Sequence, residues 1–385
     1  QLMFAQYPLR PIIKDSDEVL YSLGFSPDCQ MIAAGSGDGS VQLYNVASGR
    51  RLFKMHSTTT KPSPVISLQF KPKQSAIEPQ LILACQSSGL LTTFNSFKGQ
   101  TVSQMQVVNE NQAPTETYVV KFNNDGSNFV TGSKDGHIRV FDSQYQKLMM
   151  TLKDGNGKDT AGHSNRVFAM CYNDKNMNVL YTGGWDHTVQ VWDMRVGHSV
   201  ASLHDVSIFG DSMDVRDQTL MVGNYNSYNQ LQFFDVRNPV APISQKIISW
   251  EEEKHATVAE FDDQELKKLE EINEQLIENV QNPDDDDAPE GRLKEQDEMV
   301  TAEVAPQEDA DMFEPTMIYD CKFGKTSQTF FAGGSGGRQV RVYRQGQVAG
   351  VFRPNAAVYC CAASMDGRFG AVAGNKFGIQ VFVLE

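Results

Sequence analysis

The chain has 385 residues, of which 40% are apolar, and a formal net charge of −14 at pH 7. It contains no run of about eighteen apolar residues, so we expect no membrane-spanning helix and no membrane partner. Its six cysteines include no C-x-x-C pair, which favours buried free thiols. Its seven histidines lack metal-ligand spacing, so we expect neither a metal nor a cofactor.

The charge is distributed unevenly. Residues 251–314 hold 24 acidic and 5 basic residues, a charge of −19, which leaves +5 for the rest of the chain. The sequence therefore predicts a mildly basic body that carries an acidic insert, and the two need separate electrostatic arguments. The body has no stripe of Arg and Lys interleaved with aromatic residues, so we expect no nucleic-acid partner.

One four-residue pattern recurs seven times: an apolar residue, any residue, a usually apolar residue and an aromatic residue. Its copies occupy residues 41–44, 91–94, 138–141, 189–192, 231–234, 340–343 and 379–382. The copies begin 50, 47, 51, 42, 109 and 39 residues apart, and removing the 64-residue insert reduces the interval of 109 to 45. A period of about 40 to 50 residues is that of a four-stranded propeller blade, so we predict an all-β, seven-bladed β-propeller.

Other segments supply the remaining strands of each blade. A strand of small residues precedes the pattern, as at residues 31–35 and 129–132, and an apolar strand such as residues 65–70, 167–172 or 317–323 comes earlier still. Asp38-Gly39 and Asp135-Gly136 favour tight hairpin turns with positive φ between the second and third strands.

The two ends of the chain are predicted to meet. The seventh pattern stops just before Glu385, so the last blade lacks an outer strand. We expect the extended segment at residues 4–14 to complete that blade and close the ring. Residues 1–250 then hold this strand and blades one to five, and residues 315–385 hold blades six and seven.

The acidic insert, residues 251–314, separates blades five and six. Within it, residues 262–281 have the spacing of an amphipathic helix. The apolar stripe consists of Leu266, Leu269, Ile272, Leu276 and Val280. We consider three roles: a solvated loop with its helix against the propeller, a helix that docks in a partner's groove, and a segment that masks the basic body.

The fourth blade resembles the WD-repeat family. It contains Ala161-Gly162-His163, then the seven residues from Thr182 to Thr188, and it ends in Trp192-Asp193. The resemblance implies that His163, Thr182, Asp186 and Trp192 form a hydrogen-bonded tetrad that stiffens the blade. Blade three keeps Thr131 and Asp135 but has Phe141 in place of the tryptophan.

Two consecutive blades end their patterned strand in similar sequences, Trp192-Asp193-Met194-Arg195 and Phe234-Asp235-Val236-Arg237. Both resemble the docking motif of substrate receptors for cullin-type ubiquitin ligases. The candidate adaptor contacts are Asp193, Arg195, Asp235 and Arg237. The alternative is that each Asp is a turn residue that pairs locally with its own Arg.

We expect the partner surface to lie on the propeller face that carries the turns between second and third strands. Its candidate residues, from blades three to five, are Lys134, Arg166, Trp185, Tyr225 and Tyr228. Tryptophan, tyrosine and arginine are the residues of interface hot spots. The alternative is that Trp185 packs on the neighbouring blade and is half-buried.

These observations favour a non-catalytic protein-interaction scaffold in a multi-subunit assembly, in the cytoplasm or on the cytoskeleton, including a cilium. One alternative is a ubiquitin-ligase substrate receptor. A more remote one is a propeller enzyme, which we do not expect because the sequence shows no paired acid and base.

Overall fold

The computed structural model describes the propeller strands and most of their connections. The described residues are 10–13, 18–59, 61–72, 80–158, 160–226, 228–237, 248, 250, 317–335, 339–352, 354, 356–375 and 378–384. The chain divides into two units, residues 1–251 with 313–385, and residues 252–312. The acidic insert and its predicted helix at residues 262–281 therefore lie outside the described residues.

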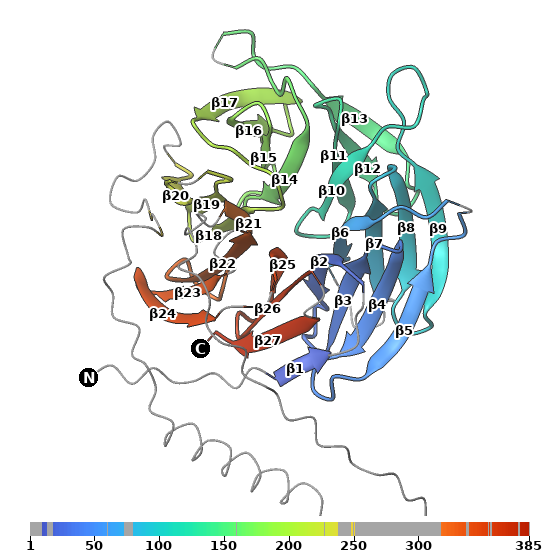
Figure 1. Cartoon of the computed structure of the whole chain (residues 1–385). Helices are drawn as coiled ribbons and strands as arrows, with labels where there is room; N and C mark the ends of the chain where they lie inside the picture. The colour runs from blue at the N-terminus through green and yellow to red at the C-terminus, as the bar shows by residue number, and fades with distance from the viewer. Residues whose placement is uncertain are drawn as a thin grey trace, which may run out of the picture. The chain divides into compact units, whose positions relative to one another are not determined.

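Seven antiparallel sheets form the first unit, and their innermost strands surround a common axis (Figure 1). The innermost strands are β2 (Leu20–Phe25), β6 (Val65–Phe70), β10 (Thr117–Phe122), β14 (Val167–Tyr172), β18 (Met213–Arg216), β21 (Met317–Phe323) and β25 (Val358–Ala363). The second strands are β3 (Met31–Ser36), β7 (Leu81–Gln86), β11 (Asn128–Ser133), β15 (Val179–Gly184), β19 (Thr219–Gly223), β22 (Thr329–Ser335) and β26 (Phe369–Gly374). The seven-bladed, all-β architecture predicted from the repeat is confirmed.

The patterned segment forms the third strand of every blade. These strands are β4 (Ser40–Asn45), β8 (Leu90–Asn95), β12 (Ile138–Asp142), β16 (Thr188–Asp193), β20 (Leu231–Asp235), β23 (Val340–Arg344) and β27 (Ile379–Val383). The outer strands are β5 (Arg51–His56), β9 (Gln100–Gln106), β13 (Leu148–Leu152), β17 (His198–His204) and β24 (Gln347–Phe352), with β1 (Arg10–Ile13) in blade seven.

The N-terminal strand closes the ring as predicted. β1 pairs antiparallel with β27, with Arg10 opposite Val381, and Figure 1 shows the two side by side. First and last segments of the chain thus share one sheet, so the ring has no open joint between its first and last blades.

Blade five departs from the four-strand expectation. Its described residues form a three-stranded sheet of β18, β19 and β20. On the outer side of β20, Ile248 makes an isolated bridge to Leu231, and the buried Trp250 carries the guanidinium of Arg341 over its ring at 4.6 Å. This cation–π contact between Arg341 and the buried ring of Trp250 links Trp250 to blade six.

Small residues in the second strands let neighbouring blades approach closely. A Cβ atom added to Gly183 would lie 2.2 Å from the Cδ1 atom of Ile208, at the next blade. The predicted hairpin glycines Gly39 and Gly136 have φ of +83° and +77°, values that residues with a side chain rarely adopt. Glycine therefore serves two needs here, close packing and turn geometry.

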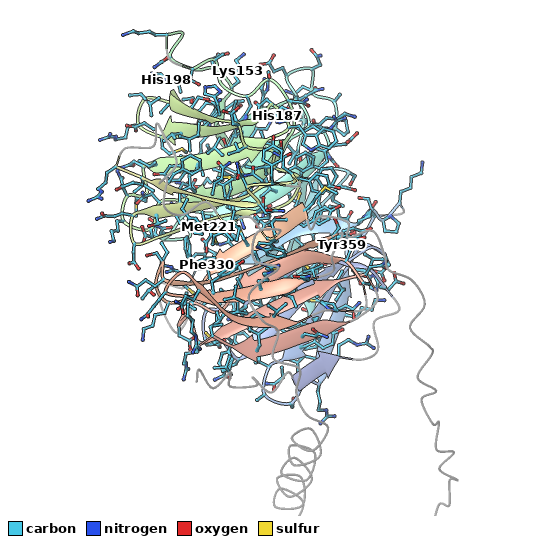
Figure 2. The ribbon with its side chains drawn as sticks, turned by 60° about the vertical axis from the view of Figure 1, so that its left-hand side comes forward. Lys153, His187, His198, Met221, Phe330 and Tyr359 are labelled. Atoms are coloured by element: carbon cyan, nitrogen blue, oxygen red, sulfur yellow. The ribbon has the colours of Figure 1, made fainter. Side chains whose placement is uncertain are left out.

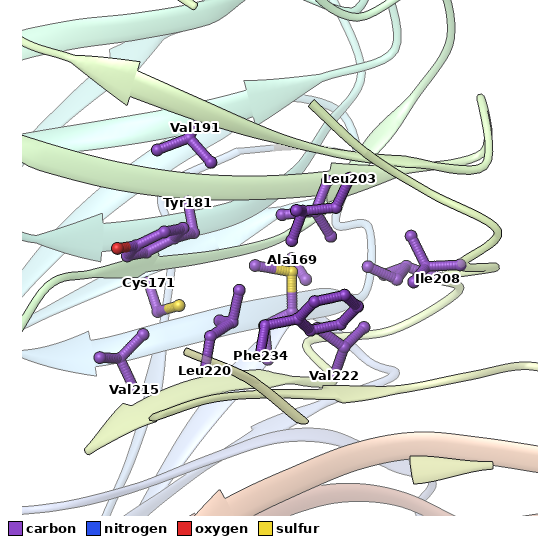
Figure 3. Close-up of a cluster of buried hydrophobic side chains, with 13 residues drawn as sticks. Ala169, Cys171, Tyr181, Val191, Leu203, Ile208, Val215, Leu220, Val222 and Phe234 are labelled. Carbon is purple, nitrogen blue, oxygen red and sulfur yellow. The ribbon is translucent and has the colours of Figure 1, made fainter. Parts of the chain in front are cut away.

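The core is divided among the interfaces between blades. Buried apolar clusters in the described part each draw on two adjacent blades. Figure 3 shows the cluster of blades four and five, where Tyr181 and Leu203 face Leu220 and Phe234. Met221 and Phe330, labelled in Figure 2, belong to the next cluster. Five of the six free cysteines are buried, as predicted, and Cys29 is partly exposed.

Two β-bulges recur around the ring. In blades one to four, six and seven, the register of the inner strand slips at its second or third residue. In blades one to four and six, the outer strand slips in the same way against the third strand. A bulge adds one unpaired residue and changes the direction of its side chain. The inner-strand bulge therefore presents one residue to the axis, and the outer-strand bulge presents one residue to the rim.

Candidate functional site

The four side chains of the implied tetrad form one buried chain of hydrogen bonds in blade four. The Nε1 atom of Trp192 donates to Oγ1 of Thr182 at 2.7 Å. The Nε2 atom of His163 lies 2.7 Å from the same hydroxyl, and its Nδ1 atom lies 2.7 Å from a carboxylate oxygen of Asp186. With Nδ1–H on His163, every donor points the same way, from indole to hydroxyl to imidazole to carboxylate.

The tetrad ends in the turn between the second and third strands. Asp186 also accepts hydrogen bonds from the backbone N–H of Ser164 at 3.0 Å and from the hydroxyl of Thr188 at 3.0 Å. Burial by itself would raise the pKa of Asp186, but the hydrogen bonds that its carboxylate accepts, that from His163 above all, lower it overall. The carboxylate is thereby fixed, together with the turn that carries Trp185.

Blade three holds the corresponding turn differently. Asp135 makes a two-pronged ion pair with Arg139, with N···O distances of 3.2 and 2.6 Å. The Oγ1 atom of Thr131 is buried without a hydrogen-bond partner in the described structure. Phe141 stacks on Phe129 at 5.1 Å between ring centroids. The acidic turn residue is retained, while the polar chain behind it is replaced by aromatic packing.

Five bulged residues of the inner strands, together with one ring from a connection, form an aromatic collar at one mouth of the central channel. The collar consists of Tyr21, Tyr118, Phe168, Phe209, Tyr319 and Tyr359. From Tyr118 round to Tyr21, each ring contacts the next with centroids 4.6 to 5.7 Å apart, and no ring contact joins Tyr21 to Tyr118 among the described residues. Ile66 is the bulged residue of blade two, and Phe209, from the connection before β18, supplies the ring in blade five. We call this face of the propeller the collar face.

The collar surrounds a cavity of about 350 Å³. Its lining also includes the polar residues Ser22, Ser67, Asp211 and Asp320. Burial raises the pKa of Asp320 to about 7, although its ion pair with Lys322 at 2.6 Å opposes this.

Four of the five predicted surface residues join the collar in one network. Lys134 pairs with Glu116 at 2.6 Å, and Glu116 accepts the hydroxyl of Tyr118 at 2.6 Å. Nε of Arg166 donates to that same hydroxyl at 3.2 Å. The guanidinium of Arg166 lies over the ring of Trp185, 5.0 Å from its centroid. Charged, phenolic and indole groups from blades three and four thus meet at the collar.

Trp185 is half-buried by this arrangement. Its ring lies 5.2 Å from Phe168 and 5.5 Å from Phe209, and 38% of the residue stays exposed. The packing that we weighed as an alternative is therefore present, and it leaves part of the indole open. Tyr225 stacks on Phe209 at 4.9 Å. Tyr228 is 63% exposed, and no ring contact brings it into the collar among the described residues.

Each predicted ligase contact is a local Arg–Asp pair. Arg195 donates to Asp193 at 3.0 and 2.6 Å, and Arg237 binds Asp235 in the same geometry. The hydrogen bonds from arginine lower the pKa of each aspartate to about 2. Both pairs lie in turns that follow the third strand, at the end of the blade away from the collar, and both arginines are exposed.

Comparison with known proteins agrees with this geometry. The family model described as WD domain, G-beta repeat, matches residues 10–45, 112–142 and 156–193. These segments span the closing strand with blade one, blade three, and blade four with its tetrad. The chain is a WD-repeat β-propeller.

Curated relatives of this WD-repeat propeller share limited identity. A LEC14B homolog from Prunus armeniaca is 23% identical over 193 residues, covering 48% of this chain and 38% of the relative. Eukaryotic translation initiation factor 3 subunit I from Scheffersomyces stipitis is 26% identical over 144 residues, covering 35% of this chain and 39% of the relative. A DDB1- and CUL4-associated factor 11 homolog from Caenorhabditis briggsae is 30% identical over 78 residues, covering 20% and 13%. The chain thus matches less than half of each relative's length.

The collar is the part of the site that was not predicted. A signal was available, since Tyr21, Tyr118, Phe168 and Tyr359 each stand second in an inner strand. The described residues hold no group of three or more His, Cys, Asp and Glu side chains placed to bind a metal ion. In the same ranges there is no helix of the length and apolarity needed to cross a bilayer.

Proposed function

We propose that this WD-repeat propeller is a non-catalytic subunit of a multi-subunit assembly and that it binds a partner protein on the collar face. The observation that carries this proposal is the continuous aromatic surface made by the collar and Trp185, with Arg166 over the indole ring. Partly exposed aromatic groups beside an arginine, fixed before binding, combine large contact area with a small entropy cost.

The collar face suits a protein segment that inserts apolar or aromatic side chains. The cavity offers about 350 Å³ behind the rings, which is room for a side chain or two. Around the mouth, Lys134, Glu116 and Arg166 supply polar groups that can orient the partner's backbone. The centre of the surface would provide affinity and its polar border would provide orientation.

A double variant tests this proposal. Trp185→Ala with Arg166→Ala should abolish capture of the partner in affinity purification with quantitative mass spectrometry, while the melting temperature changes little. Tyr228→Ala is a matched control, because Tyr228 is exposed but lies outside the collar network. Undiminished capture by the double variant would contradict the proposal, and a markedly lowered melting temperature would assign both residues to the core instead.

A substrate receptor of a cullin-type ubiquitin ligase is the second candidate. Its support is the similar geometry of the pairs Asp193–Arg195 and Asp235–Arg237, with both guanidinium groups exposed in consecutive blades. One relative's name refers to such an association. Arg195→Ala with Arg237→Ala should then remove ligase adaptor subunits from the captured proteins and leave collar-dependent partners in place. Absence of adaptor subunits from the wild-type capture would contradict this candidate.

A further inference from the structure

The outer-strand bulges present one apolar residue per blade to the rim. These residues are Leu52, Val102, Met149, Val200 and Ala349. In most blades the bulged residue stands alone, since its neighbours along the strand are polar, small or partly covered. A single exposed apolar side chain is ordinary on a protein surface.

β13 of blade three is different. Leu148, Met149 and Met150 are consecutive, and 47%, 56% and 36% of each is exposed. No other outer strand in the described structure has three exposed apolar residues in a row. Methionine is flexible and polarisable, so it adapts to the shape of a partner. This rim is therefore a continuous apolar surface.

β13 also has an unpaired edge. It is the last strand of its sheet, and its only partner among the described strands is β12. No described residue of the chain that follows pairs with this edge. Instead, Gly155 bridges to Ser199 in β17, and Figure 2 shows Lys153 and His198 at the same end of blade four. The covered edge is that of blade four, and backbone groups of β13 stay available to an added strand.

The positive charges of two lysines favour one kind of added strand over another. Lys147 and Lys153 flank β13, and both are exposed, although Lys153 also contacts Glu110 at 2.9 Å. If β13 of a second copy paired antiparallel about Met150, Lys147 would face Lys153 at both ends. Like charges directly opposite each other destabilise a strand pair. A second copy is therefore disfavoured, and a segment with acidic ends is favoured.

We propose that β13 is a docking edge for an extended, apolar segment of another protein that carries acidic residues at both ends. The segment adds a fifth strand to blade three, its backbone bonds to β13, and its apolar side chains cover Leu148, Met149 and Met150. Its acidic residues pair with Lys147 and Lys153. This surface is separate from the collar face, so one propeller can hold two partners together.

The chain itself supplies a probe of the required chemistry. The full-length variant Lys147→Glu with Lys153→Glu presents the same apolar strand between acidic ends. Mixed with wild-type protein, it should form a 1:1 complex in analytical ultracentrifugation, because each lysine then faces a carboxylate. Neither protein should form this complex alone. The single variant Lys147→Glu should pair with itself, since both ends then carry opposite charges. The mixtures are measured at an ionic strength of about 0.15 M, where attraction between the net charges of two molecules is screened beyond ~8 Å.

A control separates strand docking from simple charge attraction. The acidic double variant with Leu148→Ser and Met150→Ser added has the same charge but lacks much of the apolar surface. Its melting curve should show a cooperatively folded protein, because both residues are at least partly exposed, and it should bind wild-type protein at least about tenfold more weakly. A dissociation constant weaker than about 1 mM for the original mixture would overturn the proposal. Equal binding by the serine control would also overturn it.

Discussion

Blades three and four occupy equivalent positions in the ring and fix the same turn by different means. In blade four, Asp186 is held by a buried chain that runs through His163 and Thr182 to Trp192. In blade three, Asp135 is held by the neighbouring Arg139, while the hydroxyl of Thr131 has no hydrogen-bond partner among the described residues. The tetrad is therefore one of two solutions to a single problem, fixation of an acidic turn residue.

The residue before that aspartate is what the fixed turn presents. Blade four presents Trp185 and blade three presents Lys134, and both belong to the network on the collar face. The two tryptophans of blade four, seven positions apart, thus have separate roles. Trp192 is fully buried and stabilises the blade, and Trp185 is partly exposed and available to a partner.

The largest expected effect is on Trp192. Trp192→Ala should lower the free energy of unfolding by about 3–5 kcal/mol, because it empties a large core site and leaves Thr182 without its donor. The melting temperature should fall by roughly 5–15 °C. A shift of less than about 2 °C would show that this side chain does not support the blade.

A smaller effect on stability distinguishes Thr182 of blade four from Thr131 of blade three. Thr182→Val should cost about 1–3 kcal/mol, since it leaves the indole N–H and an imidazole nitrogen buried and unpaired. Thr131→Val, the matched change in blade three, should be neutral or stabilising, because its hydroxyl is already unpartnered. Equal melting temperatures for the two variants would contradict the distinction between the blades.

A smaller effect is expected in the pH dependence of the stability that Asp186 contributes. Its folded-state pKa is lowered, so ionised Asp186 contributes stability above its ordinary pKa of about 4, and this is lost as pH falls through the folded value. The difference in melting temperature between wild type and Asp186→Asn should therefore be largest near neutral pH and narrow below about pH 4. A gap that widens on acidification would contradict this sign.

The smallest expected effect on stability is at the exposed arginine of blade four. Arg195→Ala should leave the midpoint of chemical denaturation unchanged within experimental error, because an exposed ion pair contributes little to stability. The measurement is a chemical denaturation curve with the slope held in common with wild type. A clearly lowered midpoint would mean that the turn depends on this pair.

The repeat predicted most of the fold because each copy specifies the same local structure. The patterned third strands, the glycines of the hairpin turns and the closing strand follow from alternation and spacing. The contacts of His163 and Asp186 follow from the family resemblance, because the tetrad has fixed positions in each repeat.

The collar was missed for a physical reason. A bulge changes which side chain faces the axis, and alternation of polar and apolar residues does not reveal a one-residue insertion. Blade five adds a further difficulty, since Phe209 comes from a connection and not from a strand. Trp185 and Arg166 contact each other, while the part of these residues in a partner surface stays a prediction, and the sequence pattern did not reveal the rings beside them.

Tryptophan fluorescence tests the central claim most directly. The chain has three tryptophans, of which Trp192 and Trp250 are buried and Trp185 is partly exposed. Acrylamide should therefore quench mainly Trp185, and Trp185→Phe should remove the quenchable component. When the partner captured through the collar face is added to wild-type protein, that component should become protected. Unchanged quenching at saturating partner would contradict the assignment of Trp185 to the binding surface.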